Sequence, residues 1–240
     1  MLFRSRYDKL KAVVFDYGAT LDTNGVHWYN IFCDQYQKEF PNLKDEDLRN
    51  AYVYGERMLA KQRMVATDDT FLQLLEKKIR LQADFLVENA ILKDISAESL
   101  KRLCDNCYSV PLSCTRKAQG LLQTLAKKYR IALISNFYGN VETVLREFGL
   151  RDYFELVVES ASVGYSKPDK RLYEYCLKHL DLKAEECLMI GDSYPKDIVP
   201  AKKLGFHTIW LKGRGWQKEE NSDAPSADEI INDLQQVGEL

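Results

Sequence analysis

The sequence predicts an α/β protein, a doubly wound parallel sheet that carries an all-helical insertion. Residues 12–15 form a short, apolar, partly β-branched run that ends at Asp16 and a glycine-containing segment, as a buried strand followed by a loop does. Residues 26–108 then show long amphipathic stretches without a convincing strand. After them, strand and helix patterns alternate nearly to the end of the chain, and this alternation favours right-handed crossovers and a parallel sheet.

The alternating part predicts the following elements in order. After the first strand and the insertion, we expect helices at residues 118–129, 140–150, 170–180 and 198–205, and strands at residues 131–137, 154–160, 187–192 and 207–213. A polar, turn-rich segment that begins at Gly213 predicts an exposed loop, in which Arg214 and Trp216 either stay in solvent or reach the crevice or a neighbouring subunit. Residues 229–237 predict a terminal helix.

The insertion is long enough to be a small helical bundle. Its amphipathic stretches lie at residues 28–40, 47–62, 70–92 and 97–108. We therefore expect a core domain of residues 1–23 and 112–240 and a cap domain of residues 24–111. The aromatic residues of the cap have helical spacing, which favours packing in its own core over the lining of a pocket. They are Trp28, Tyr29, Phe32, Tyr36, Phe40, Tyr52 and Tyr54.

Composition narrows the possible partners. The chain has 240 residues, 45% of them hydrophobic, which is enough for a substantial core. Its 34 basic and 36 acidic residues are interspersed and leave a formal net charge of -2. No long-range field therefore favours nucleic acid or an anionic membrane. No apolar run reaches the ~20 residues that a membrane span needs.

The six cysteines indicate a reducing compartment. The N-terminal residues have no apolar signal-peptide core, so we expect reduced thiols and a cytoplasmic protein. Cys104 and Cys107 form a C-x-x-C that suits a redox or zinc pair, but no second pair with ligand spacing accompanies it. Two buried thiols one helical turn apart are the better interpretation.

Polar residues follow four of the predicted strands. These are Asp16 with Thr20, Ser135 with Asn136, Lys167, and Asp192 with Asp197. The carboxyl ends of parallel strands converge on one crevice, so Asp16 and Asp192, far apart in the sequence, can meet at a single metal or phosphate site. The set contains a carboxylate nucleophile, a hydroxyl and an amide, a cation and an acidic pair suited to Mg²⁺, which are the groups that phosphoryl transfer uses.

Each group also has a plain structural interpretation. Asp16 and Asp192 can be helix caps at strand ends, Ser135 and Asn136 can cap the helix that begins near Asn140, and Lys167 can be a solvated lysine before Pro168. Thr20 can be a turn residue. The order of the four motifs favours the functional interpretation.

The four motifs together resemble those of the haloacid dehalogenase (HAD) superfamily of hydrolases. The family pattern is D-x-D-x-T, then Ser or Thr, then Lys, then G-D-x-x-x-x-D. Here the motifs are DYGAT at residues 16–20, LISN at 133–136, GYSKP at 164–168 and GDSYPKD at 191–197. The resemblance covers almost the whole chain, and it likens the helical insertion to the cap domain of one HAD subclass.

The resemblance implies roles for these positions. Asp16 would attack phosphorus and form an aspartyl-phosphate. Thr20 and Ser135 would bind oxygens around the site, with Asn136 beside the substrate. Lys167 would hold the nucleophile and the phosphate together.

The resemblance also implies an Mg²⁺ site. Asp192 would ligate Mg²⁺ alongside Asp16 and the backbone carbonyl of residue 18, which does not depend on the side chain of Gly18. Asp197 would either ligate the metal or orient Lys167.

Gly18 departs from the family pattern. Phosphatases of this family carry a carboxylate there, as the general acid and base. Such help is typically worth about 10² to 10⁴ in rate, so its absence predicts a slow or specialised enzyme. Asp22 and His27 are nearby substitutes, although Asp22 also reads as a turn or capping residue and His27 as a helix-start residue.

Three functions are compatible with the sequence. The first is a Mg²⁺-dependent phosphatase of a small phosphorylated metabolite, active as a monomer or homodimer. The second is a 2-haloacid dehalogenase, in which the aspartate attacks carbon without a metal; the acidic residue Asp192 argues against it. The third is a regulatory protein that keeps the fold and binds a partner through its cap.

Overall fold

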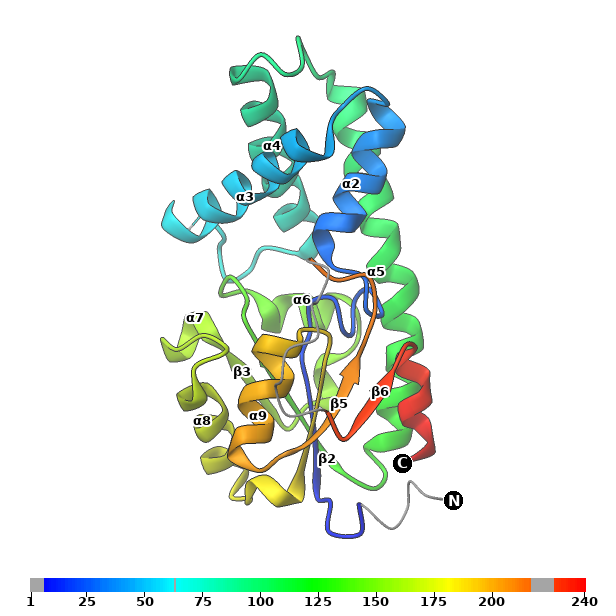
Figure 1. Ribbon diagram of the computed structural model, residues 1–240, viewed down its shortest axis with the longest axis vertical. Helices are drawn as coiled ribbons and strands as arrows, with labels where there is room; N and C mark the ends of the chain where they lie inside the picture. The colour runs from blue at the N-terminus through cyan, green and yellow to red at the C-terminus, as the bar shows by residue number, and fades with distance from the viewer. Residues whose placement is uncertain (1–6, 63, 217–226) are drawn as a thin grey trace.

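The computed structural model describes residues 7–62, 64–216 and 227–240. A parallel sheet of six strands forms the centre of the core domain, in the order β3-β2-β1-β4-β5-β6 (Figure 1). The strands are β1 (Ala12–Phe15), β2 (Arg130–Ser135), β3 (Leu156–Glu159), β4 (Cys187–Gly191), β5 (His207–Leu211) and β6 (Glu229–Ile231). The prediction of a doubly wound parallel sheet is confirmed.

The strand register brings the motif residues to one edge. β1 lies between β2 and β4, with Phe15 opposite Leu133 and Ile190. The chain order reverses at β1, since β2 follows on one side and β4 on the other. Such a switch point is where ligands bind in open α/β sheets.

Helices cover both faces of the sheet. The helices and short helical turns of the core are α6 (Val141–Glu147), α7 (Ser160–Val163), α8 (Lys170–Leu180), α9 (Val199–Leu204), η1 (Arg151–Tyr153), η2 (Ala184–Glu186), η3 (Tyr194–Ile198) and η4 (Leu234–Glu239). On one face, Val14 and Met189 belong to an apolar cluster with residues of α8 and α9. On the other, Val13 belongs to a second cluster that includes residues of α6 and extends into the cap. The alternation of strand side chains thus divides the apolar core into two layers.

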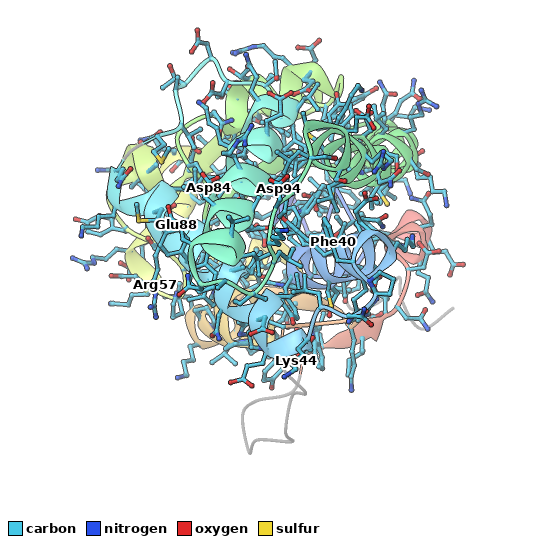
Figure 2. The ribbon with its side chains drawn as sticks, turned by 90° about the horizontal axis from the view of Figure 1, so that it is seen from above. Phe40, Lys44, Arg57, Asp84, Glu88 and Asp94 are labelled. Carbon is cyan, nitrogen blue, oxygen red and sulfur yellow. The ribbon has the colours of Figure 1, made fainter. Side chains whose placement is uncertain are left out.

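The cap is all-helical, as predicted. It contains α2 (Trp28–Glu39), α3 (Asp45–Gln62), α4 (Phe71–Glu88) and the first half of α5 (Ala97–Leu125), and it stands above the carboxyl ends of the strands (Figure 1). Of its aromatic residues, Trp28, Tyr29, Phe32 and Tyr36 are buried, and the others pack against them. Their predicted role in core packing is confirmed. Seen from above, charged residues of both signs, such as Arg57 and Glu88, lie on the cap's outer face (Figure 2).

Two segments differ from the prediction. The helices expected at residues 97–108 and 118–129 are parts of one helix, α5, which runs from the cap to the base of the core (Figure 1). The proposed boundary between residues 111 and 112 therefore falls inside this helix. Pro111 favours a break because it cannot donate a backbone hydrogen bond, yet the helix continues and Thr115 Oγ1 donates to the carbonyl of Pro111 at 2.6 Å.

The expected terminal helix at residues 229–237 is also wrong in its first part. Glu229–Ile231 forms the edge strand β6, and the backbone N–H of Lys212 donates to the carbonyl of Ile231 at 2.8 Å. A 3₁₀ helix, η4, follows, with Asp233 as its N-cap. A strand of three residues is too short to show a periodicity that separates strand from helix, so the pairing with β5 decides. None of the helices in the described parts of the chain is long and apolar enough to cross a membrane.

Candidate active site

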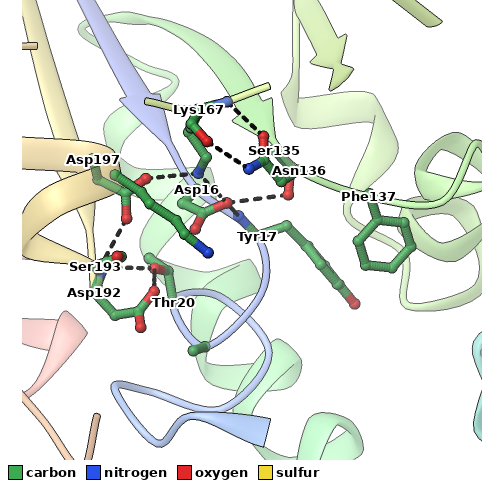
Figure 3. A network of polar contacts seen from close by, with 12 residues as sticks. Asp16, Tyr17, Thr20, Ser135, Asn136, Phe137, Lys167, Asp192, Ser193 and Asp197 are labelled. Carbon is green, nitrogen blue, oxygen red and sulfur yellow. Dashed lines mark hydrogen bonds and ion pairs between the residues drawn. The ribbon is translucent and has the colours of Figure 1, made fainter. Parts of the chain in front are cut away.

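Asp16 follows β1, and one of its two carboxylate oxygens is held by three donors. Oδ1 accepts from the backbone N–H of Tyr17 at 2.7 Å and from the Ser135 hydroxyl at 3.1 Å, and it pairs with the Lys167 ammonium at 2.8 Å (Figure 3). Among the described residues, Oδ2 has no such partner. The side chain is thus fixed in orientation, with one oxygen left to react or to bind an ion.

Lys167 is the buried cation of the site. Its backbone is held by Asn136, whose amide oxygen accepts from the Lys167 N–H at 2.8 Å and whose amide nitrogen donates to the Lys167 carbonyl at 3.0 Å. The ammonium lies between Asp16 and Asp197, 2.6 Å from Asp197 Oδ1. Burial alone would lower the pKa of Lys167, but the two carboxylates outweigh it and raise the pKa. The lysine is therefore charged at neutral pH.

Asp197 is fully buried, and both of its oxygens are engaged. Oδ1 faces Lys167, and Oδ2 accepts from the backbone N–H of Ser193 at 2.9 Å. A Cβ at Gly191 would lie 2.4 Å from Asp197 Oδ2, so only glycine at the end of β4 leaves room for this carboxylate. This arrangement favours the orientation of Lys167 over metal ligation, the two roles that the sequence left open for Asp197.

Thr20 and Asp192 form a reciprocal pair. The Thr20 hydroxyl donates to Asp192 Oδ1 at 3.2 Å and accepts from the Asp192 backbone N–H at 3.1 Å. The indole N–H of Trp210 donates to the Asp192 carbonyl at 2.8 Å. Thr20 is fully buried and its hydroxyl is engaged with Asp192 as donor and as acceptor, so in this geometry it positions Asp192.

Ligand atoms of Asp16, Asp192 and Asp197 all lie within 4.8 Å of one another. Burial and the neighbouring carboxylates raise the pKa of Asp192. Burial likewise raises the pKa of Asp197. A divalent cation would relieve this repulsion, and Mg²⁺ suits carboxylate oxygens with several retained waters. The donor set therefore fits the predicted Mg²⁺, with Asp16 and Asp192 as the side-chain ligands that have oxygens to spare.

The loop beside Asp16 is open at Gly18. A Cβ at this position would meet nothing within 4 Å, so the missing carboxylate leaves free space. The next residue, Ala19, has φ of 63°, in the left-handed region that favours glycine. The Ala19 N–H donates to Asp22 Oδ1 at 2.7 Å, which stabilises the turn. The backbone carbonyl of Gly18 stays available in principle as an ion ligand, because it needs no side chain.

Asp22 and His27 are a turn residue and a helix cap, as the plainer interpretation predicts. Asp22 is fully buried, and its second oxygen accepts from the Trp28 indole at 2.7 Å. Burial raises the pKa of Asp22 to about 7. His27 is the N-cap of α2, where Nδ1 accepts from the Tyr29 N–H at 3.2 Å. Burial, with Lys196 nearby, lowers the pKa of His27 to about 4, so it is neutral where the sequence suggested a proton donor.

The segment after β5 is less exposed than predicted. Trp216 is half-buried, and its ring lies 5.0 Å from that of Tyr29 and 5.4 Å from that of Tyr52 (centroid distances), so it packs on the cap. Arg214 is exposed and pairs with Asp34 of α2 at 2.6 and 2.7 Å. The rest of the expected loop, residues 217–226, lies outside the described residues.

Two features of the site were missed at the level of sequence. Asn136 holds the backbone of Lys167 and does not cap α6, whose N-cap is Asn140. Gly191 makes room for Asp197; the Gly-Asp pair at the end of an apolar run was a signal for this.

Cys104 and Cys107 are buried and free, which confirms the expectation of two thiols on a helix face.

The fold and the site define a class of protein: a doubly wound α/β domain with an aspartate at the switch point of its sheet, beside a lysine and two further aspartates. The model of the haloacid dehalogenase-like hydrolases matches residues 3–205. The chain therefore belongs to this family of hydrolases.

Relatives by sequence include phosphatases. The chain is 29% identical over 171 residues to pyrimidine 5'-nucleotidase YjjG of Escherichia coli, covering 70% of this chain and 72% of the relative. It is 37% identical over 97 residues to glyceraldehyde 3-phosphate phosphatase of Methanocaldococcus jannaschii, covering 40% and 41%. The second match spans less than half of that relative.

Solved structures share the fold over nearly the whole chain. A dehalogenase captured as an intermediate complex has a TM-score of 0.64 at 19% identity, with 95% of this chain and 96% of the other covered. The HAD hydrolase YfnB of Bacillus subtilis, bound to magnesium, has a TM-score of 0.58 at 18% identity, with the same coverage. At these identities the similarity establishes the fold alone.

Proposed function

We propose that the chain is a Mg²⁺-dependent phosphatase of a small phosphorylated metabolite and forms an aspartyl-phosphate on Asp16. The observation that carries this proposal is the gathering of Asp16, Asp192 and Asp197 around a buried lysine. Attack at the carbon of a haloacid gains nothing from the acidic pair. A phosphoryl group, with its several negative oxygens, requires a cation at that point.

The residues of the chain divide the work as follows. Asp16 Oδ2 attacks phosphorus, the bond to the leaving oxygen breaks, and the phosphoryl group is carried as a mixed anhydride until water hydrolyses it. Lys167 neutralises charge on the nucleophile and on the phosphoryl oxygens. Ser135 fixes Asp16 in the free enzyme and, next to Asn136, turns its single O–H to an oxygen of the substrate when the phosphoryl group binds. Bound Mg²⁺ would supply charge neutralisation and hold the phosphoryl group in line with Asp16.

Proton transfer is the weak part of this site. With glycine at position 18, the position that carries the general acid and base in phosphatases of this family supplies no carboxylate to protonate the leaving oxygen or to activate water. Asp22 and His27 do not replace it, since Asp22 is enclosed and His27 is a helix cap. Hydrolysis is therefore slow in both steps and fastest for leaving groups that need little protonation.

The relatives support a small substrate, since those named above act on a pyrimidine nucleotide and on glyceraldehyde 3-phosphate according to their names. We propose a core domain of residues 1–23 and 112–240 under a cap of residues 24–111, active as a monomer or homodimer. The six free thiols support activity in the reducing cytoplasm.

A panel of phosphorylated metabolites tests this proposal, with phosphate release measured with Mg²⁺ and with EDTA and with Asp16→Asn as the blank. We expect release that needs Mg²⁺ and is absent from the blank. Halide release from 2-chloropropionate that is indifferent to EDTA would overturn it in favour of the dehalogenase. A phosphorylated Asp16 without phosphate release from any substrate would favour the regulatory protein.

A further inference from the structure

A partly buried ion pair of the cap contacts the core loop that follows Ser135. The ammonium of Lys78, on α4, lies 2.7 Å from Glu56 Oε1, on α3, and 2.7 Å from the hydroxyl of Tyr138, which follows β2. The Tyr138 hydroxyl donates to Glu56 Oε2. Lys78 is only 7% exposed, and its ammonium also lies 4.6 Å from the centroid of the Tyr138 ring. These three residues form what we call the polar triad.

The polar triad is connected to the catalytic end of the sheet. Tyr138 comes three residues after Ser135, whose hydroxyl holds Asp16. Its ring lies 5.2 Å from that of Phe137, which in turn lies 5.5 Å from that of Tyr17, the residue after the nucleophile (centroid distances; Figure 3 shows the last pair). The triad thus joins the cap to the loop at the edge of the site.

Glu56 has unused capacity to accept hydrogen bonds. Each of its oxygens receives one donor from the triad, whereas a carboxylate offers about four lone-pair sites. Its side chain is 28% exposed, against 8% for that of Lys78. The accessible group of the triad is therefore an acceptor, and its partner is a hydrogen-bond donor such as a substrate hydroxyl.

Stability alone gives a weak reason for such a pair. Replacing a buried ion pair with apolar residues is often neutral or stabilising, because desolvation of both ions offsets their attraction. Lys78 and Tyr138 do, however, fix the orientation of Glu56. A fixed acceptor distinguishes a hydroxylated substrate from one of the same size without hydroxyls.

We propose that Glu56, oriented by Lys78 and Tyr138, is the specificity-determining residue of the site and accepts hydrogen bonds from a hydroxylated leaving group. The preferred substrates are then polyol or sugar phosphates. This inference rests on the proposed phosphatase function and adds the substrate class.

The test compares glycerol 1-phosphate with propyl phosphate, which has the same carbon chain without hydroxyls. We expect the wild type to prefer glycerol 1-phosphate at least about tenfold in kcat/KM, as a hydrogen bond to a charged group implies. Glu56→Gln should reduce this preference to within about threefold, mainly through KM for glycerol 1-phosphate. If Glu56→Gln fails to fold, the double variant Glu56→Leu with Lys78→Met removes both charges together and should show the same loss.

Glu147→Gln is the matched control, because Glu147 also joins core to cap, through the Tyr108 hydroxyl at 2.6 Å and the Phe71 N–H at 2.5 Å. It should keep the preference even if both rates fall. A wild type without preference, or a Glu56→Gln variant that slows both substrates equally, would overturn the assignment.

A binding measurement separates failure of the Glu56 assignment from failure of the proposed phosphatase function. If neither ester is hydrolysed, titration calorimetry of both esters with Asp16→Asn and Mg²⁺ still measures the discrimination. Tighter binding of glycerol 1-phosphate that depends on Glu56 supports the assignment, and equal binding overturns it.

Discussion

On one side of Asp16, three donors converge on a single carboxylate oxygen, whereas on the other side, at Gly18, the chain leaves open space. On the first side, contacts fix the position of every polar group. Even Asp197, the carboxylate that orients Lys167, fits only because residue 191 is a glycine. The second side lacks the group that would move protons. If Asp16 is the nucleophile that we propose, holding a nucleophile and moving a proton are separate tasks, and this site is built for the first without the second.

Removal of the Lys167 ammonium should disrupt the side of the site that holds Asp16. We expect Lys167→Met to lower kcat about 10³-fold, as the loss of a charge-stabilising donor does. It should also lower the free energy of unfolding by about 3–5 kcal/mol, because Asp16 and Asp197 lose their buried counter-charge. Phosphate release and urea denaturation measure the two effects.

Lys170→Met is the control, since Lys170 lies in the same segment and makes an exposed pair with Glu174. It should change neither quantity appreciably. A fully active Lys167→Met enzyme would contradict the role assigned to the ammonium.

Filling the open side should raise activity. Gly18→Asp introduces a carboxylate where a side chain meets no atom within 4 Å and φ is not positive. We expect turnover to rise about 10²-fold or more, within the range of general acid–base help. Gly18→Asn has the same shape without the titrating group and should give no such gain. An equal gain from both, or none from Gly18→Asp, would mean that proton transfer does not limit the enzyme.

Asp22, at the end of the same loop, should make stability depend on pH. Burial raises its pKa in the folded state to about 7, well above the 3.8 of an unperturbed aspartate. Between these values the folded state holds a proton that the unfolded state has lost, so its contribution to stability, full below about pH 4, is lost as pH rises to about 7.

The measurement is the free energy of unfolding from pH 4 to 8. We expect Asp22→Asn to remove the part of this pH dependence that corresponds to about one proton. It should also cost about 1–3 kcal/mol, because an amide nitrogen cannot accept and one of the two hydrogen bonds to Asp22 is lost. Asp68→Asn, at an exposed position, should leave the slope unchanged. An unchanged slope in Asp22→Asn would show that Asp22 keeps an ordinary pKa.

Ala19 should give the smallest effect. Its left-handed backbone costs about 1 kcal/mol, and glycine would relieve this at the expense of a more flexible unfolded chain. We expect Ala19→Gly to gain about 0.5 kcal/mol in urea denaturation. Ala60→Gly, on the exposed part of α3, should instead lose about 1 kcal/mol. A similar loss at Ala19 would contradict the strained turn.

Most of the fold followed from local pattern. The apolar run that ends at Asp16 and the alternation after the insertion predicted the sheet. Buried parallel strands are short apolar runs that can be recognised in a sequence without knowledge of their partners. The continuity of α5 through Pro111 did not follow, since only packing along both domains overrides a helix-breaking residue. The strand at Glu229–Ile231 did not follow either, because its pairing with β5 is a tertiary contact that three residues of sequence do not record.

The site was predictable as a set of residues but not as a network. Order and spacing singled out Asp16, Lys167 and Asp192. Thr20 hydrogen-bonds to Asp192, and Asn136 hydrogen-bonds to the backbone of Lys167. Both contacts depend on which loops meet in space. Contacts of this kind leave no trace in the spacing of one sequence.

The central claim is that Asp16 carries the phosphoryl group and that the open position at Gly18 slows its release. The most direct test is an acid quench of the enzyme during turnover with Mg²⁺ and a phosphate monoester, followed by mass analysis of the peptide that contains Asp16. We predict that a phosphoryl group accumulates on Asp16 in the wild type, that it accumulates less in Gly18→Asp, and that it is absent in Asp16→Asn. Phosphate released at the same rate with no adduct on Asp16 at any time would contradict the account.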